Sequence, residues 1–251
     1  MKAWFALCLL PLLAMAADAD RISGHYRYTS YQVTLPNGRV IGLKEMGASD
    51  ASLDIAVAAY FLQPNPPVNA AKWFWVDWVN EYTPDTFRAI GIILLAGWIA
   101  IGLTRRWRRT ALALAFIGVS LLVGPGFATW AVKEHQLRAR PFDVVEFGGQ
   151  RKFTPALQQA NQCTDNCAFV SGHVACGFFF ASLMLLDPRR RWWWIACGVA
   201  GGLLIGLARM AVGAHWLSDV LWAFPITLAS SWLVWWGLAF IYKNELPPEV
   251  A

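Results

Sequence analysis

The chain has 251 residues, of which 57% are hydrophobic and 15% are charged, whereas an average soluble domain has roughly 45–50% and ~25%. This composition excludes a disordered, coiled-coil or collagen-like chain and argues for a protein embedded in lipid. The net charge of +5 alone would suggest nucleic acid, but seven arginines in two short loops account for much of it, so we expect no nucleic-acid partner.

The N-terminus looks like a secretory signal peptide. Lys2 precedes an apolar run that ends at Met15, and the small residues Ala14 and Ala16 suit a cleavage site. Such a segment is too short for a comfortable membrane span. We therefore expect residues 1–16 to be a signal peptide, and the alternative is an uncleaved sixth helix with the same topology.

Residues 17–85 form a polar segment before the first long apolar run. Two β-rich stretches, 26–35 and 39–43, flank the turn sequence PNG at residues 36–38 and predict a hairpin. Apolar residues at helical spacing over 50–62 predict a helix. Aromatic residues with charges between them follow, and they suggest an interfacial helix at headgroup depth. These aromatic residues are Trp73, Phe74, Trp75 and Trp78.

Five apolar runs approach or exceed the ~17–25 residues that a helix needs to cross a bilayer. They are residues 87–103, 111–132, 169–186, 192–212 and 217–242. Arg88 lies in the first turn of the first run and has to extend to the interface. The sequence therefore predicts an all-α polytopic membrane bundle of five to six spans, with its core over 86–242 and a tail at 243–251.

Positive charge predicts the orientation of the bundle, because short cytoplasmic loops are rich in Lys and Arg. The two arginine-rich loops are residues 105–109 and 189–191. With both loops in the cytoplasm, the segment before residue 87, the loop at 133–168 and the turn around His215 face outward. The tail then faces the cytoplasm.

Three groups of polar residues lie where the outward ends of the spans should meet. The groups are Lys133 with Arg140 and Pro141, Ser171-Gly172-His173, and Arg209 with His215 and Asp219. Three cations at one point need an anion between them, and phosphate suits them because Arg offers a planar fork of donors and Lys a compact charge. A helix that starts at Ser171 and Gly172 adds free N–H groups and a positive dipole end.

The neighbours of the two histidines indicate different roles. Asp219 lies four residues after His215, about one helical turn, so its carboxylate can hold one imidazole nitrogen and leave the other free. His215 is therefore the candidate nucleophile, and His173 is the candidate acid that protonates the leaving oxygen. The chemistry would be phosphoryl transfer through a phosphohistidine, with the cations stabilising charge on the equatorial oxygens.

Other interpretations of these groups are open. Lys and Arg at span ends often mark the headgroup boundary, although Arg209 lies within an apolar run, where an ionisable residue is expensive. A non-catalytic lipid-binding or transport protein would need the cations but no oriented histidine. A metal site from His173, His215 and Asp219 is disfavoured because the cations would repel a divalent ion, so we expect no metal or cofactor.

These spacings resemble the signature of the type 2 phosphatidic acid phosphatase superfamily of membrane lipid phosphatases. The family pattern is Lys-x6-Arg-Pro, Pro-Ser-Gly-His and Ser-Arg-x5-His-x3-Asp, and the chain reads KEHQLRARP, VSGH and ARMAVGAHWLSD. Val170 stands where the family has Pro, and Ala208 where it has Ser. The resemblance covers about residues 86–242.

The resemblance implies the same roles that the residues suggest. Phosphate binding falls to Lys133, Arg140, Arg209, Ser171 and Gly172, acid catalysis to His173, and nucleophilic attack to His215 with support from Asp219. It implies a metal-independent hydrolase of the bacterial inner membrane, with its active site facing the periplasm and a phosphorylated membrane lipid as substrate.

The substrate is less determined than the chemistry. The loop sequences at residues 146–149 and 163–173 look like a bacterial branch that includes lipid A phosphatases. Other members act on undecaprenyl diphosphate or phosphatidylglycerophosphate, and some move phosphate between lipids rather than to water.

Cys163 and Cys167 lie in the outward loop just before Ser171, where an oxidising compartment permits a disulfide. Their spacing is awkward within a regular helix, because Cβ atoms four residues apart lie roughly 5–6 Å from each other. We therefore expect the loop to turn there and the two residues to form a bridge. The alternative is two free thiols.

Overall fold

The computed structural model describes residues 32–34, 40–42, 53–63, 66, 69–102 and 108–241. Four sequence predictions fall outside these residues: the signal segment 1–16, the hairpin turn at 36–38, the loop arginines at 105 and 106, and the tail at 243–251.

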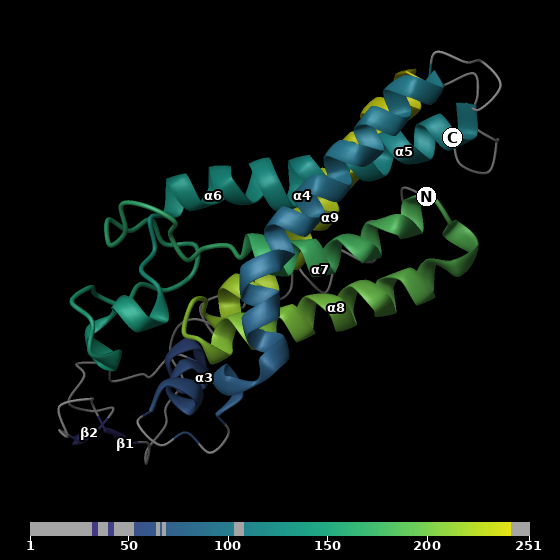
Figure 1. The fold of residues 1–251 in the computed structure, drawn as a ribbon. Helices are drawn as coiled ribbons and strands as arrows, with labels where there is room; N and C mark the ends of the chain where they lie inside the picture. The colour runs from purple at the N-terminus through teal and green to yellow at the C-terminus, as the bar shows by residue number, and fades with distance from the viewer. Residues whose placement is uncertain are drawn as a thin grey trace.

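Long helices run side by side through the described part of the chain (Figure 1). They are α4 (Phe74–Gly102), α5 (Arg108–Leu121), α8 (Arg191–Ala211) and α9 (Leu217–Ile241). Among the described residues, four helical stretches are long and apolar enough to cross a membrane, namely Phe74–Ile101, Arg109–Asp143, Pro188–Ala211 and Leu217–Ile241. They correspond to four of the five predicted spans.

The third predicted span is shorter in the structure. Helix α7 (Gly172–Ser182) and the 3-10 turn η6 (Leu183–Leu185) together hold 14 residues, or about 21 Å at 1.5 Å per residue, against a hydrocarbon core of about 30 Å. The apolar run begins at residue 169, but the helix begins at Gly172 with Ser171 as its cap, in agreement with the helix start expected at these two residues. Eight of the eleven α7 residues are buried, so their apolar character serves contacts within the protein rather than contacts with lipid.

Small residues let α7 and α8 approach closely. A Cβ atom placed on Gly198 of α8 would lie 2.3 Å from the backbone nitrogen of Ala181 in α7, and one on Gly177 of α7 would lie 2.6 Å from the carbonyl carbon of Gly201. No side chain fits at these distances. This is the small-residue packing by which helices associate in membranes.

Helix α4 differs from its prediction, because the expected interfacial helix and the expected first span are one continuous helix. It begins at Phe74, runs across residues 85 and 86, where we expected a domain boundary, and contains Pro84. The aromatic residues Phe74, Trp78 and Tyr82 along its first turns are exposed, as suits a helix end at the headgroup level.

A π-helical segment interrupts the second span. Helix α5 continues through η3 (Leu122–Ala128), which contains Pro125, into α6 (Thr129–Gln136). Thr129 donates its hydroxyl to the carbonyl oxygen of Pro125 at 2.6 Å. A Cβ atom on Gly172 would lie 3.2 Å from that same oxygen, so the segment packs directly against the start of α7.

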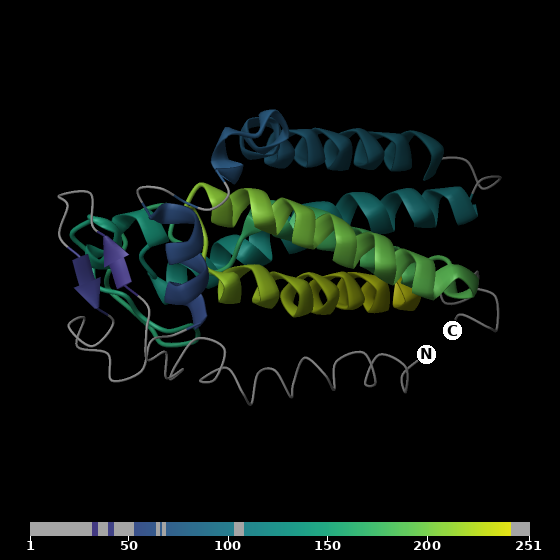
Figure 2. The same cartoon turned by 90° about the horizontal axis from the view of Figure 1, so that it is seen from below.

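The N-terminal elements lie at one end of the long helices, as both views show (Figures 1 and 2). Strands β1 (Gln32–Thr34) and β2 (Val40–Gly42) pair antiparallel with Val33 opposite Ile41. They lie within the predicted hairpin arms, but the turn between them is outside the described residues. Helix α3 (Leu53–Leu62) falls within the predicted stretch 50–62.

Short 3-10 turns complete the connections. They are η1 (Ala70–Lys72), η4 (Pro141–Asp143), η5 (Val145–Phe147) and η7 (Pro188–Arg190). An apolar cluster joins α3 to the loop after α6 and to the start of α9; its buried members are Ile55, Ala58, Ala139, Val144, Ala168 and Trp216. The segment before the bundle is therefore packed onto the end that carries the predicted site.

Candidate active site

The loop after α6 turns back sharply and carries Arg140 over the end of the bundle. Leu137 adopts a left-handed conformation with φ of 47° and donates its N–H to the carbonyl oxygen of Lys133 at 3.1 Å. Helix α6 ends there, in the manner of an αL cap. This turn explains how two cations seven residues apart reach the same place.

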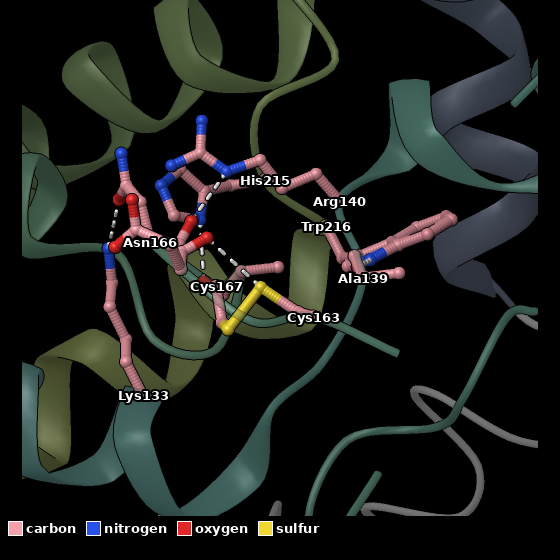
Figure 3. Close-up of a disulfide and its surroundings, with 10 residues drawn as sticks. Lys133, Ala139, Arg140, Cys163, Asn166, Cys167, His215 and Trp216 are labelled. Carbon is pink, nitrogen blue, oxygen red and sulfur yellow. Dashed lines mark hydrogen bonds between the residues drawn. A yellow bond between two sulfur atoms is a disulfide. The ribbon is translucent and has the colours of Figure 1, made fainter. Parts of the chain in front are cut away.

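Asn166 contacts both cations (Figure 3). Lys133 Nζ lies 3.4 Å from its side-chain oxygen, and Arg140 Nε donates to its backbone oxygen at 2.9 Å. Asn166 itself has a left-handed backbone with φ of 47°. The structure joins Cys163 and Cys167 in a disulfide with a Cα–Cα distance of 5.6 Å, so a small covalent ring contains the residue that holds Lys133 and Arg140.

Ser171 and Gly172 form the start of α7. The Ser171 hydroxyl accepts a hydrogen bond from the N–H of Val174 at 3.4 Å, and Ser171 is fully buried. The first N–H groups of a helix have no partner within it and carry its positive dipole end. Any side chain at Gly172 would press on η3, which explains why glycine stands here.

His173 and Arg209 meet on a residue that the sequence analysis missed, Asn80 of α4. His173 Nε2 lies 3.1 Å from the backbone oxygen of Asn80, and Arg209 Nη1 donates to its side-chain oxygen at 2.6 Å. Pro84, four residues later, has no N–H to offer that backbone oxygen. The proline in α4 therefore leaves the Asn80 backbone oxygen free to accept from the His173 ring. The four-residue spacing from Asn80 to Pro84 was the sequence feature that could have identified Asn80.

Three of the predicted phosphate ligands are cations, and they form no direct ion pair with the described residues. Within the described ranges, no carboxylate lies within 4.0 Å of Lys133, Arg140 or Arg209. Arg209 is only 7% exposed, and its Nε has no hydrogen-bond partner in the described part of the chain. Buried cations without counter-ions are costly, so the arrangement is suited to an anionic ligand.

His215 is held differently from the prediction. Its Nδ1 lies 2.7 Å from the backbone oxygen of Ala168 and 3.6 Å from an Asp219 carboxylate oxygen. The shorter contact requires a proton on Nδ1, which leaves the lone pair on Nε2. Burial, together with the positive charges of Arg209 and Lys133, holds the pKa of His215 well below its ordinary value. The ring is therefore neutral and nucleophilic at neutral pH.

The Asp219 carboxylate is engaged by a second residue that the sequence analysis missed. Arg138 Nη1 donates to Asp219 Oδ1 at 2.6 Å, and the N–H of Trp216 donates to Oδ2 at 2.8 Å. The latter bond fixes the start of α9 in the manner of a capping box. Arg138 lies between Lys133 and Arg140 in the sequence. It was missed because the spacing pattern includes only those two cations.

The two departures from the expected signature lie in packed surroundings. Ala208, at the position where the signature has Ser, is fully buried in a cluster with Val76 and Val79 of α4. Val170 is fully buried against Ala156 and Phe169. A hydroxyl at residue 208 would face apolar side chains here, so the substitution suits the docking of α4.

Together, these residues have the chemistry that a phosphoryl-transfer site needs. The lone pair on His215 Nε2 is suited to nucleophilic attack, the cations and helix N–H groups are suited to bind equatorial phosphate oxygens, and the His173 imidazole is suited to proton transfer.

Comparison with known proteins points to the same chemistry. The PAP2 superfamily model matches residues 110–242. The chain is 35% identical to a lipid A 4'-phosphatase of Francisella tularensis subsp. novicida over 68% of its own length and 76% of that protein. It is 38% and 37% identical to lipid A 4'-phosphatases of Rhizobium leguminosarum and Rhizobium etli, over 40% of its own length in each case. It spans less than half the length of these two rhizobial proteins, 44% and 40%. No solved structure matches the chain.

Proposed function

The chain belongs to the PAP2 superfamily, and from this premise we propose that it is a membrane lipid phosphatase that removes phosphate from lipid A at the periplasmic face. The single observation that supports this most is the set of cations without counter-ions beside a buried, neutral His215. A lipid-binding protein needs the cations, but it gains nothing from an imidazole that is fixed in its nucleophilic tautomer.

The reaction has two steps in this proposal. Nε2 of His215 attacks the phosphorus atom, the bond from phosphorus to the leaving oxygen breaks, and His173 gives that oxygen a proton. Water then attacks the phosphohistidine, gives up a proton to His173, and releases phosphate with His215 restored. Lys133, Arg140 and Arg209 offset the charge on the equatorial oxygens in both steps.

The supporting structure orients the nucleophile. The Ala168 backbone oxygen accepts the Nδ1 proton of His215, and Asp219 lies near enough to favour the positive imidazole of the phosphohistidine. Ser171 and Gly172 add the N-terminal end of α7, which is favourable for a bound phosphate.

Lipid A is the proposed substrate because it appears in the names of all three relatives. Undecaprenyl diphosphate and phosphatidylglycerophosphate offer the same phosphate to the same cations. The proposed periplasmic location of the site, on the outward side of the inner membrane, is supported by the two arginine-rich loops, which we expect to be cytoplasmic.

Lipid analysis of cells with and without the protein tests this proposal. Loss of the protein should raise the pool of lipid A that carries the 4'-phosphate, and leave the pools of undecaprenyl diphosphate and phosphatidylglycerophosphate unchanged. The purified protein should release inorganic phosphate from lipid A, and His215→Ala should not. Phosphate recovered on a second lipid would instead indicate phosphotransfer, and an unchanged lipid A pool would contradict the proposed substrate.

A further inference from the structure

A buried ionic network lies behind His215 and Asp219, and it is centred on Arg138. This guanidinium is 1% exposed, and its Nη1 contacts Asp219 Oδ1 at 2.6 Å. Its Nη2 contacts Asp54 Oδ2 at 2.8 Å. Its Nε donates to the backbone oxygen of Thr154 at 2.8 Å. Arg138 thus joins a carboxylate of the active-site helix α9 to a carboxylate of α3.

Asp54 is the only charged residue of α3, whose sequence is LDIAVAAYFL, and it is fully buried. It accepts hydrogen bonds from the N–H and the hydroxyl of Ser218, the residue just before Asp219. Ser218 also accepts from Arg138 Nη1 at 2.8 Å. Three donors therefore surround one carboxylate, and two of them come from the first turn of α9.

The charges of this network are informative. One guanidinium faces two carboxylates, so the network carries a net charge of −1 when both are ionised. Burial raises the pKa of Asp54, and the positive charge of Arg138 opposes that increase. All of the hydrogen-bond neighbours of Asp54 are donors, which suits the ionised form. Without Asp54, Arg138 would neutralise Asp219 completely and leave no net negative charge near the His215 ring.

We propose that Asp54 is a positioning residue for the active site, which balances the charge of Arg138 so that Asp219 keeps its negative influence on the His215 ring. This inference rests on the proposed phosphatase function. Asp54 lies outside residues 110–242, which match the family model, and it comes from the segment that precedes the bundle. That segment would therefore be a working part of the enzyme rather than an appendage.

Asp54→Asn tests the proposal, because asparagine keeps the size of the side chain and removes its charge. The matched control is Asp77→Asn, which changes an exposed aspartate of α4. Activity on lipid A in mixed micelles and inhibition by inorganic phosphate are measured on the full-length protein in detergent. We expect kcat to fall at least tenfold in Asp54→Asn and the inhibition constant of phosphate to stay within threefold, since other residues bind the anion. Asp77→Asn should behave as wild type.

A second substitution distinguishes this electrostatic role from a purely structural scaffold role. The double variant, in which Arg138→Gln is added to Asp54→Asn, lacks the positive charge that the first substitution leaves unbalanced. Its kcat should be at least threefold higher than that of Asp54→Asn. A scaffold role predicts a further loss, which would overturn the proposal. So would a wild-type kcat in Asp54→Asn, or a joint loss of kcat and phosphate binding in that variant.

Two further measurements keep the outcome unambiguous. If Asp54→Asn yields no folded protein, Ser218→Ala decides: a fall in kcat of threefold or more at unchanged inhibition by phosphate supports the proposal, and a wild-type kcat contradicts it. Wild-type protein and His215→Ala in the same assay test the phosphatase function by itself. An active wild type with an unaffected Asp54→Asn would overturn only the role of Asp54.

Discussion

The hydrogen bond from His215 to the Ala168 backbone oxygen changes how the nucleophile is understood. The four-residue spacing to Asp219 predicts a direct side-chain pair, but the carboxylate lies 3.6 Å away, while the carbonyl oxygen of Ala168 lies at 2.7 Å. The segment before α7 therefore selects the tautomer, and Asp219 acts as a nearby charge. A substitution at Asp219 should then reduce the rate without abolishing the orientation of the ring.

The depressed pKa of His215 predicts a pH-dependent stability. The folded protein keeps this ring neutral at a pH where the unfolded chain, with an ordinary pKa of about 6.5, already binds a proton. Stability is therefore lost as the pH falls below about 6.5, by up to about 1.4 kcal/mol per pH unit. Between pH 7 and 5, the Tm of wild type in detergent should fall more steeply than that of His215→Asn. Parallel curves would contradict the buried neutral ring.

Sequence patterns identified the site residues that belong to a motif, and they missed the residues that reach the site only through tertiary packing. Asn80 and Asn166 each touch a predicted site residue, and Asp54 reaches Asp219 only through Arg138, yet each stands alone in its segment. No spacing rule connects residue 54 with residue 219, because tertiary packing of α3 brings them together. The feature of the sequence that could have identified Asp54 is its position as a lone aspartate in an apolar helix, because an ionisable residue there needs a buried partner.

Helix α7 shows the limit of hydropathy at the scale of an element. An apolar run is compatible both with a span that faces lipid and with a short helix enclosed by other helices. The close contacts of Gly177 and Gly198 with the neighbouring helix identify α7 as enclosed. The runs of α8 and α9 were predicted to within a few residues, because lipid-facing side chains such as Leu204 and Trp236 continue their apolar character along the whole helix.

Gly198→Ala should destabilise the contact between α7 and α8. The added Cβ atom would lie 2.3 Å from the Ala181 nitrogen, so the helices must separate, and overpacking of this kind costs about 1–3 kcal/mol. Gly237→Ala in α9 is the matched control, because nothing lies within 4 Å of its added Cβ atom. Thermal unfolding in detergent should show a lower Tm for the first variant only, and equal Tm values would contradict the close packing.

The disulfide ring should matter more for substrate handling than for stability. Cys163→Ser with Cys167→Ser frees Asn166, which holds Lys133 and Arg140, and a ring this small contributes little loop entropy. We expect KM to rise about three- to tenfold while the protein still inserts and survives extraction. Cys197→Ser, at a free cysteine of α8, serves as the control.

The disulfide itself can be tested by mass spectrometry. Protein purified without reductant should show residues 163 and 167 joined and protected from alkylation. Two freely alkylated thiols would rule out the ring and, with it, the explanation of the raised KM.

At the scale of the whole molecule, the bundle serves to bring distant segments to one end, where the chain supplies the charge for the reaction. The ends of α6, α7 and α8 contribute one cation or helix end each, and α3 packs over them. The three membrane-length stretches within residues 108–241 could be predicted from apolar runs. The closure of the site by α3 and α4 could not, because it depends on the packing of single residues.

A site whose positive charge comes from side chains should not depend on a metal ion. We expect full activity in the presence of a chelator, and inhibition by vanadate, which resembles the five-coordinate phosphorus that Lys133, Arg140 and Arg209 would stabilise. The measurement is phosphate release from lipid A in each condition. Activity lost in the chelator and restored by a divalent metal would be incompatible with the proposed site.

Phosphorylation of His215 during the reaction can be detected by rapid-quench labelling. The protein is mixed with lipid A that carries ³²P at the 4' position, the reaction is stopped in base, where phosphohistidine survives, and the labelled peptide is sequenced. His173→Ala should hydrolyse lipid slowly but still label with a substrate whose leaving group needs little protonation. We expect the ³²P label on His215 in wild type and no label in His215→Ala. Label on another residue, or phosphate release at the wild-type rate by His215→Ala, would contradict it.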